Sequence, residues 1–550
     1  MKALQDLAAD VVVIGSGGAG LTAAILAHDN GVRVMVLERS DKVGGTTAVS
    51  GGGVWVPMNH YMAEPDSREA ALTYCRRLTA GRADDTLVEK FVDTAAEMAR
   101  YLEGHTPVRF VTCSMPDYQS ELPGARADGG RTLDQEFFAR SELGEWWAKL
   151  RPSPLMFVPM MMEEALKSMG NPRSIPVQAI VERMQQGLMG SGNALVGRLL
   201  KGCLDRSIEI ALGTRARRLV HEEGRVIGVE VEYEGGCARI DARSVVLACG
   251  GFEWNQDLWN HFQPGTITHH CSPPYNEGDA LLMVAELGAD LANMSEAWLY
   301  PGFAIPGEEH EDRPVSRWVI GERTLPHSIV VNRHGQRFTN EGANYNDMAK
   351  ALLTFDPTTF GYQNLPCWSI MDSQYRRSYP IMTVMPRDQD PDWLAKDDSL
   401  DGLASKLGIG ASGLTTTVER FNELARAGKD EDYGRGESAY ERWLGDPNTV
   451  HPNLGTIEVP PFYALPMHLA AAGTKGGPRT NTKGQVLNVR DAVIPGLYAA
   501  GNAMAGISGP GYYGGGGTIG LAMTWGYLCG INAAQEAKAS ASARELAAGS

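Results

Sequence analysis

The sequence predicts an α/β protein in which a large, discontinuous domain carries a smaller inserted α+β domain. Three observations support this prediction. The apolar run 10–14 leads through a glycine-rich loop into a helix of small residues, and the run 32–38 reads as a second buried strand. Two distant runs, 239–251 and 495–502, also end in glycines, as strands do when they return to the same sheet.

The loop after the first strand has the spacing G-x-G-x-x-G at residues 15–20. Gly15 permits the tight turn, Gly17 lets the backbone approach a pyrophosphate, and Gly20 lets the helix pack closely on the strand. Glu38 follows about twenty residues later, where a carboxylate can accept hydrogen bonds from a ribose. Strand, loop, helix and acid in this order predict a Rossmann-type dinucleotide-binding unit.

A second glycine-rich run, Lys-Val-Gly-Gly-Thr-Thr-Ala-Val-Ser-Gly-Gly-Gly, covers residues 42–53. A nicotinamide enzyme has no need of it, whereas a flavoprotein can bring its backbone N–H groups against an extended cofactor. A solvent loop is the alternative, although apolar residues return at once in 54–57. No second strand-bound G-x-G-x-x-G is found, because the glycines of 190–197 follow a helix-like segment. The sequence therefore predicts FAD. It also predicts that a quinone, another protein, dioxygen or an added dye reoxidises the flavin, rather than NAD(P)H.

Composition excludes several classes of function. The 550 residues are enough for two domains, and a net charge of −16 argues against a nucleic-acid partner. Eight cysteines without a C-x-x-C pair give no disulfide framework, and His269-His270-Cys271 lacks further ligands for a metal site. The start has no signal-peptide pattern and no run reaches a membrane span, so the sequence predicts a cytoplasmic enzyme.

The methionine-rich segment 155–162, with Trp146 and Trp147 before it, has two interpretations. Such a segment is typical of core packing. It also suits an adaptable wall for a hydrophobic substrate, or a contact with a membrane surface, and the sequence leaves these alternatives open.

These motifs together resemble the fumarate reductase and succinate dehydrogenase flavoproteins and, within them, the 3-ketosteroid dehydrogenases. The resemblance runs almost from end to end of the chain. It implies two lobes, noncovalent FAD and a catalytic cap, which agrees with the insertion predicted from the glycine-ended strands. The predicted FAD domain covers 1–293 and 466–550, and the predicted cap covers 294–465. The matching motifs are GSGGAG, GGTTAVSGGGVWVP, PDYQSELPGA, GNALVGRLL, SVVLACGGFEWN, NEGDAL, SIVVNRHGQRFTNE, GTKGGPRTN, GLYAAGN and GTIGLAMTWGY.

Candidate cofactor-binding residues follow from the glycine loops and from the resemblance. They lie in both parts of the FAD domain. They are Gly15, Ser16, Gly17, Gly18, Ala19, Gly20, Glu38, Arg39, Gly44, Gly45, Thr46, Thr47, Ser50, Gly51, Gly52, Ala216, Ala248, Gly250, Gly501, Asn502, Gly517, Thr518 and Ile519.

The resemblance to Δ1-dehydrogenases implies the catalytic residues Tyr118, Tyr345, Tyr512 and Gly516. In that branch the last tyrosine and the backbone N–H four residues later hold the ketone oxygen. The middle tyrosine takes the α-proton, assisted by the first, while hydride leaves the neighbouring carbon for flavin N5. The chemistry is sound, because an enolate needs an oxyanion-type clamp and a base within reach of the α-proton. The resemblance thus predicts α,β-desaturation of a hydrophobic cyclic ketone, with a 3-ketosteroid as the leading substrate.

Several alternatives stay open at this point. The proline usual in the family after the last tyrosine is missing, so Tyr513 could replace Tyr512. The related enzymes that desaturate the neighbouring ring bond typically have a serine two residues after the last tyrosine. This chain has Gly514 there, which favours Δ1 chemistry. The substrate could be a smaller ketone such as cyclohexanone, and a flavoprotein that only transfers electrons is a further class. A fumarate-type alkene reductase would instead use the cap residues Arg317, Arg323, His327 and Arg337.

Overall fold

The main sheet joins strands from both ends of the chain. Its order is β24-β25-β11-β1-β2-β8. At its centre, β1 (Ala8–Ile14) pairs in parallel with β2 (Val34–Leu37) and β11 (Gly236–Leu247), and β25 (Val493–Ala499) lies parallel to β11. In β1 and β2 the paired residues 11–14 and 34–37 are continuous buried apolar runs, as expected where helices cover both faces of a parallel sheet. The predicted α/β fold is confirmed.

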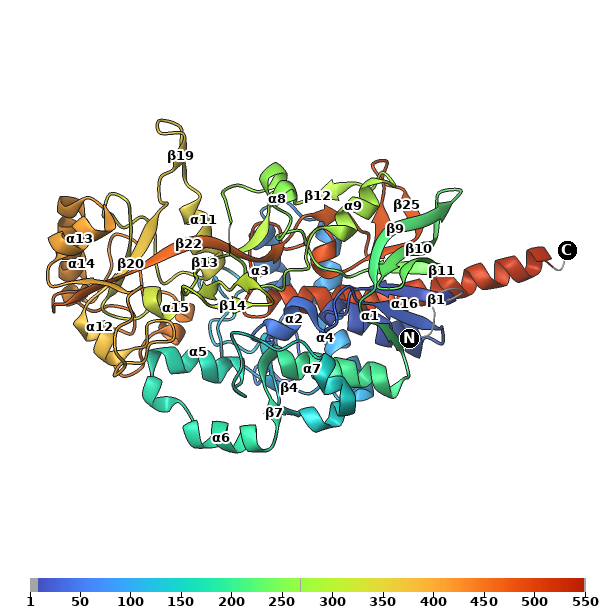
Figure 1. The fold of residues 1–550 in the computed structure, drawn as a ribbon, viewed down its shortest axis with the longest axis horizontal. Coiled ribbons are helices and arrows are strands. Elements are labelled where there is room, and N and C mark those ends of the chain that lie inside the picture. The colour runs from blue at the N-terminus through green and yellow to red at the C-terminus, as the bar shows by residue number, and fades with distance from the viewer. Residues whose placement is uncertain (1–7, 268, 549–550) are drawn as a thin grey trace.

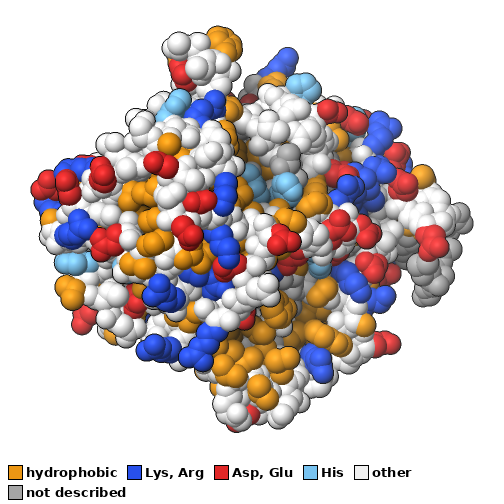
Figure 2. All heavy atoms as spheres, turned by 60° about the vertical axis from the view of Figure 1, so that its left-hand side comes forward, with side chains coloured by type: hydrophobic (Ala, Val, Ile, Leu, Met, Phe, Trp, Pro, Cys, Tyr) orange, Lys and Arg blue, Asp and Glu red, His pale blue; other side chains and the backbone are white. Residues whose placement is uncertain are grey.

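The computed structural model describes residues 8–267 and 269–548 (Figure 1). Residues 1–7 and 549–550 of the predicted FAD domain therefore lie outside the described part. Figure 2 shows charged side chains of both signs over one face of the molecule. Within the described ranges, no helix combines the length and the apolar composition needed to cross a bilayer.

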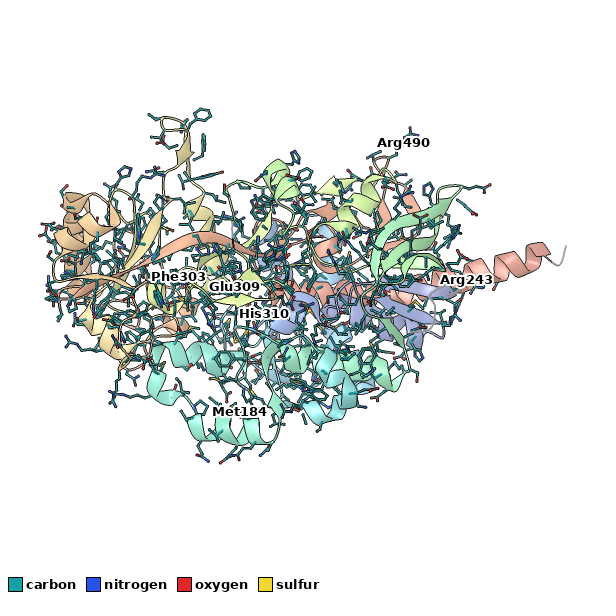
Figure 3. All side chains as sticks on the ribbon, viewed as in Figure 1. Met184, Arg243, Phe303, Glu309, His310 and Arg490 are labelled. Atoms are coloured by element: carbon teal, nitrogen blue, oxygen red, sulfur yellow. The ribbon has the colours of Figure 1, made fainter. Side chains whose placement is uncertain are left out.

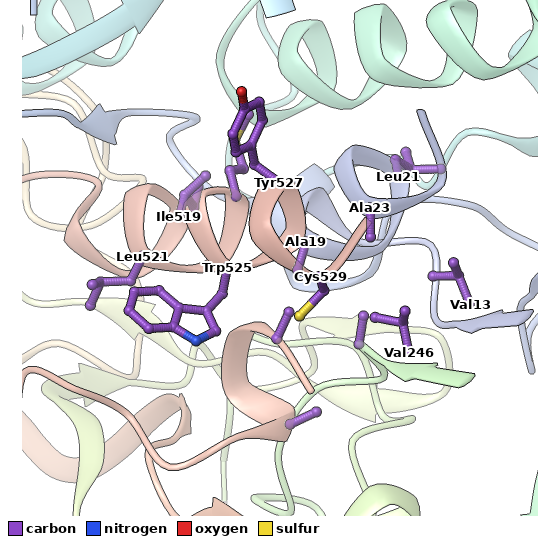
Figure 4. Close-up of a cluster of buried hydrophobic side chains, with 14 of the residues drawn as sticks. Val13, Ala19, Leu21, Ala23, Val246, Ile519, Leu521, Trp525, Tyr527 and Cys529 are labelled. Carbon is purple, nitrogen blue, oxygen red and sulfur yellow. The ribbon is translucent and has the colours of Figure 1, made fainter. Parts of the chain in front are cut away.

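Two helices of small residues pack against each other over the main sheet. They are α1 (Gly18–Asp29) and α16 (Gly517–Ala548), which cross as Figure 4 shows. A β-carbon at Gly526 would lie 2.3 Å from the carbonyl oxygen of Ala19, and one at Gly530 would lie 2.4 Å from that of Ala23. Glycine at these positions allows a close approach, which holds the first glycine loop beside the start of α16.

A second sheet is formed by the middle of the chain, in the order β16-β13-β22-β20-β17. Its long strand β22 (Phe462–Thr474) pairs antiparallel with β13 (Ala297–Phe303) and β20 (Cys367–Met371). Phe303 lies in the hydrophobic core on this sheet, in the left-hand part of the molecule in Figure 3. Since β22 continues to residue 474, the sheet does not break at 465, and the predicted cap boundaries remain predictions.

The other elements connect or cover these two sheets. The helices are α2 (Gly45–Val49), α3 (Arg68–Thr79), α4 (Asp85–His105), α5 (Met162–Gly170), α6 (Val177–Gln185), α7 (Ser191–Asp205), α8 (Gln256–Phe262), α9 (Asp279–Ala285), α10 (Gly321–Thr324), α11 (Tyr345–Leu352), α12 (Ser373–Ser378), α13 (Leu400–Leu407), α14 (Ala411–Ala427) and α15 (Ala439–Leu444). The remaining strands of the two main sheets are β8 (Glu209–Ala211), β9 (Arg215–Glu222), β10 (Arg225–Tyr233), β16 (Arg317–Trp318), β17 (Ser328–Asn332), β21 (Ala395–Asp397) and β24 (Gln485–Leu487).

Candidate active site

A cavity of about 400 Å³ extends from the glycine loops of the main sheet to the middle part of the chain. Most of the predicted cofactor residues form its wall on the side of the main sheet. They are Gly15, Ser16, Gly17, Gly18, Ala19, Glu38, Arg39, Gly45, Thr46, Thr47, Ser50, Gly51, Gly52, Ala216, Ala248, Gly250, Gly501, Asn502, Thr518 and Ile519.

Three predicted cofactor residues lie behind this wall, where they pack against the protein itself. A β-carbon at Gly20 would lie 2.0 Å from the carbonyl oxygen that opens the same loop. A β-carbon at Gly44 would lie 2.6 Å from the side chain of Ala48, and one at Gly517 would lie 3.0 Å from the ring of Tyr512. These glycines shape the wall rather than line it.

Gly17 differs from the other glycines of its loop. Gly15 has φ +106°, and a β-carbon there would meet the carbonyl oxygen of Ala248 at 2.4 Å. A β-carbon at Gly17 would find nothing nearer than the hydroxyl oxygen of Thr47, at 3.8 Å. The protein therefore has room for a side chain at Gly17. Because glycine has none, this space in the cavity is open to a ligand. This open backbone at the start of a helix fits a pyrophosphate.

Glu38 joins the first glycine loop to the second strand. One oxygen of its carboxylate accepts hydrogen bonds from the hydroxyl of Ser16 at 2.6 Å and from the Ser16 N–H at 3.3 Å. The other oxygen accepts from the Ser40 N–H at 2.9 Å. Glu38 thus fixes the loop while it also lines the cavity, and its predicted contact with a ribose stays a prediction.

Three tyrosines from distant parts of the chain meet in the cavity wall. Tyr345 is the first residue of α11, and the Tyr118 hydroxyl donates a hydrogen bond to the Tyr345 hydroxyl at 2.9 Å. The ring centroid of Tyr512 lies 5.1 Å from that of Tyr118 and 5.5 Å from that of Tyr345. All three side chains are buried and line the cavity. The predicted trio therefore forms one cluster.

Two hydrogen-bond donors in this cluster face the cavity. The Thr518 hydroxyl donates to the Tyr512 hydroxyl at 2.9 Å, so the phenolic proton of Tyr512 is available for a ligand. Gly516 also lines the cavity, and its N–H has no acceptor among the described residues. Gly516 has φ +80°, and a β-carbon there would lie 2.2 Å from the backbone of Gly53, so glycine is required. Together, Tyr512 and Gly516 can form a clamp for one oxygen.

Tyr513 points away from the cavity. It is buried in the core, with its ring centroid 5.1 Å from that of Trp55 and 6.1 Å from that of Phe91. Its neighbour in sequence, Tyr512, is therefore the tyrosine that reaches the ligand space.

Burial decides the protonation state of the cluster. It raises the pKa of Tyr118, Tyr345 and Tyr512 above the ordinary value for a phenol. The largest cause in each case is the loss of water around the charged form. All three tyrosines are therefore neutral at neutral pH before a ligand binds.

Sequence reasoning missed most of the apolar wall around the tyrosines. Met115 and Trp318 line the cavity, and the Trp318 ring centroid lies 4.4 Å from that of Tyr345. Part of the methionine-rich segment lines it as well, namely Leu155, Met156 and Met162. For these residues the pocket-wall interpretation fits the structure better than core packing does.

The four cap residues that a fumarate-type reductase would use already have partners within the protein. All four are described, and of these only Arg317 lines the cavity, where its guanidinium pairs with Glu308. Arg337 forms ion pairs with two buried acids, while Arg323 and His327 hydrogen-bond to backbone carbonyls. None of the four offers an unpaired positive charge to a dicarboxylate in this cavity.

Comparison with known proteins agrees with the geometry. The model of the family described as FAD binding domain matches residues 10–519. The 4-oxocyclohexanecarboxylate 2-dehydrogenase of Sinomonas cyclohexanicum is 39% identical, with 98% of this chain and 96% of that protein covered. A 3-oxosteroid 1-dehydrogenase of Mycobacterium tuberculosis is 37% identical over 96% of this chain and 98% of that protein.

A solved structure has the same architecture. The 3-ketosteroid Δ1-dehydrogenase of Sterolibacterium denitrificans, in complex with 1,4-androstadiene-3,17-dione, superposes with a TM-score of 0.91 at 34% identity. The match covers 96% of this chain and 99% of that one. The predictions of FAD and of an oxidoreductase acting on CH–CH groups are confirmed. The chain belongs to the FAD binding domain family, in the 3-ketosteroid dehydrogenase branch of the fumarate reductase and succinate dehydrogenase flavoproteins.

Proposed function

We propose that the protein desaturates a hydrophobic cyclic ketone next to its carbonyl group, and that a 3-ketosteroid dehydrogenated at the Δ1 position is its substrate. The observation that carries the proposal is the cluster of Tyr118, Tyr345 and Tyr512 beside the Gly516 N–H in one cavity wall. The names of two relatives indicate ketone substrates of two sizes, a steroid for one and a substituted cyclohexanone for the other. The second candidate is therefore dehydrogenation of a monocyclic ketone.

The first step of the mechanism is the binding of the ketone oxygen. The Tyr512 hydroxyl and the Gly516 N–H donate hydrogen bonds to it. Because negative charge moves to this oxygen as the α-proton leaves, donors fixed there stabilise the transition state more than the bound ketone. The Thr518 hydroxyl, 2.9 Å from the Tyr512 hydroxyl, keeps the phenol turned toward the substrate.

The second step is removal of the α-proton by the phenolic oxygen of Tyr345. A phenol of ordinary pKa costs about 4 kcal/mol to ionise at pH 7, and burial adds to that cost. The Tyr118 hydroxyl donates to the Tyr345 oxygen, so it stabilises the phenolate. When bound, FAD supplies the two-electron acceptor for the β-hydride, and we propose an external quinone or protein, or a dye in the assay, as the acceptor that follows.

A dye-reduction screen tests the proposed function. We expect purified, flavin-loaded protein to reduce an artificial acceptor with 4-androstene-3,17-dione, and to do so with a kcat/KM at least about tenfold above that for cyclohexanone. Succinate serves as the control and should give no reduction. A higher kcat/KM for cyclohexanone would favour the second candidate, and turnover of succinate alone would overturn both.

We also propose that the enzyme works at a membrane surface, which it contacts through α6 and the neighbouring Phe157. Val177, Val181 and Met184 lie on one side of α6 and are 64%, 42% and 56% exposed, and Phe157 is 72% exposed. Figure 2 shows an apolar area at the lower end of the molecule, where α6 lies, and Figure 3 labels Met184 there. Leu155 and Met156, just before Phe157, line the cavity, so a hydrophobic ketone could pass from lipid to the site.

Binding to vesicles of phosphatidylcholine tests this contact. A zwitterionic lipid is chosen because the chain carries a net charge of −16. The double variant Val181→Glu, Met184→Glu should co-sediment at least about tenfold less than the parent, since two apolar side chains lose their burial in lipid. Val450→Glu, at a 90% exposed apolar position elsewhere, is the matched control and should bind like the parent. If the parent itself stays in the supernatant, the membrane proposal is wrong.

A further inference from the structure

The part of the cavity beyond the tyrosines is lined mainly by apolar side chains. Met169 belongs to α5, Leu325 follows α10, and Met382 comes from a later loop, and all three line the cavity. A β-carbon at Gly321 would lie 3.3 Å from Leu325 and 3.7 Å from Met169, so these walls are close neighbours. This region suits the hydrocarbon body of a ketone.

One acidic side chain, Glu322, stands in this apolar wall. It lines the cavity and is only 6% exposed. One of its carboxyl oxygens accepts a hydrogen bond from the Met382 N–H at 2.6 Å. The backbone N–H groups of Ile320 and of Glu322 itself also act on this carboxyl and lower its pKa, and among the described residues no cation forms an ion pair with it.

The other acids that line the cavity also have side-chain partners. Asp279 pairs with Arg39 and Arg215, and Glu38 accepts three hydrogen bonds. A buried carboxyl that is bonded only by neighbouring backbone N–H groups, with no cation beside it in an ion pair, is costly to ionise, because its lost hydration is only partly replaced. The Glu322 side chain is therefore better explained by a ligand that completes its hydrogen bonding than by packing.

The protonation of Glu322 suits an uncharged partner. Burial raises its pKa to about 7, while the backbone hydrogen bonds from Met382, Glu322 and Ile320 and the nearby charge of Arg323 oppose this rise. Tyr375, the other titratable group that faces it, stays neutral because burial raises its pKa too. A carboxyl that titrates near neutral pH can donate to a carbonyl when protonated and accept from a hydroxyl when ionised.

We propose that Glu322 is a specificity residue that hydrogen-bonds an uncharged oxygen group, a hydroxyl or a carbonyl, on the apolar body of the substrate away from the reacting ketone. The site would then select an otherwise hydrophobic ketone with such a second oxygen and would disfavour a carboxylate at that place. This inference rests on the proposed function, in which Tyr512 and Gly516 hold the first ketone.

Three steroids that differ only at carbon 17 test the inference. They are testosterone with a hydroxyl, 4-androstene-3,17-dione with a carbonyl, and 4-androsten-3-one with neither. We expect the parent enzyme to prefer the two oxygenated steroids by roughly tenfold in kcat/KM, the value of one hydrogen bond to a titratable group. Glu322→Leu should abolish this preference while turnover of 4-androsten-3-one is kept. Glu309→Gln, at an exposed acid outside the cavity, is the control and should keep the preference.

A second variant tests the role of Glu322 even if the Glu322→Leu protein does not bind flavin. Glu322→Gln has nearly the same shape and removes the negative charge. We expect it to raise kcat/KM for 3-oxo-4-androstene-17-carboxylate about tenfold relative to the parent, because the repulsion between two carboxylates is gone. An unchanged preference in the leucine variant, or no gain with the carboxylate in the glutamine variant, would overturn the inference. If the parent turns over none of these steroids, the proposed function fails instead.

Discussion

Tyr345→Phe is expected to lower kcat by about 10²- to 10⁴-fold, the usual contribution of a positioned base. The ring stays, so the T-shaped contacts with Trp318 and Tyr512 and the fold of α11 should persist. Only the oxygen that accepts the proton is lost. Steady-state dye reduction measures the loss, and the flavin absorbance per protein should equal that of the parent.

The pH profile separates a missing base from a general disturbance. Burial raises the pKa of Tyr345, so the ionised form grows only as the pH rises toward and beyond the ordinary value for a phenol. In the parent enzyme, log kcat/KM should therefore increase with pH by about one unit per pH unit below that pKa. The phenylalanine variant should lose this slope. Tyr101→Phe, which removes a partly exposed hydroxyl bonded to Asp29, is the control and should keep both rate and slope. Parental activity in Tyr345→Phe would remove this residue from the mechanism.

Gly17→Ala is expected to weaken FAD binding by at least about tenfold, or roughly 1.4 kcal/mol, without lowering the stability of the apoprotein. The added methyl group meets no protein atom closer than 3.8 Å, so the fold can accept it. It would instead occupy space in the cavity wall where the backbone of the first glycine loop is open. Flavin fluorescence titration of the apoprotein gives Kd, and thermal unfolding of the same sample gives its Tm.

Gly104→Ala is the matched control for this substitution. Gly104 is the penultimate residue of α4, has no atom within 4 Å of an added β-carbon, and does not line the cavity. Its alanine variant should bind FAD like the parent and be slightly more stable, because alanine has a higher helix propensity than glycine. Unchanged flavin affinity in Gly17→Ala would mean that the cofactor does not approach this loop.

The parts of the site that follow from local sequence could be predicted. The loop 15–20 and the run 42–53 need glycine for reasons of backbone conformation and close approach, and these needs are visible in the sequence itself. The tyrosine cluster is different. Nothing in the spacing of Tyr118, Tyr345 and Tyr512 brings them together, and only the resemblance to a family predicted it.

The rest of the site depends on tertiary packing. The sequence alone does not decide which of the adjacent residues Tyr512 and Tyr513 contacts the ketone. The structure decides it, because Tyr513 is buried in the core beside Trp55. Trp318 and Met162 line a cavity, yet an apolar residue in a cavity wall has the same sequence pattern as one in a core. Glu322 gave no signal at all, since an acid in a short helix is ordinarily taken as exposed.

The central claim is that one cavity holds a ketone at Tyr512 and Gly516 while Tyr345 removes the adjacent proton. Anaerobic mixing of the flavin-loaded enzyme with one equivalent of 4-androstene-3,17-dione, without any dye, tests it most directly. We predict that the flavin band bleaches and that mass spectrometry finds one product lighter by two hydrogens, with the new double bond next to the 3-keto group. A flavin that stays oxidised with unchanged steroid, under conditions where binding is saturated, would contradict the account.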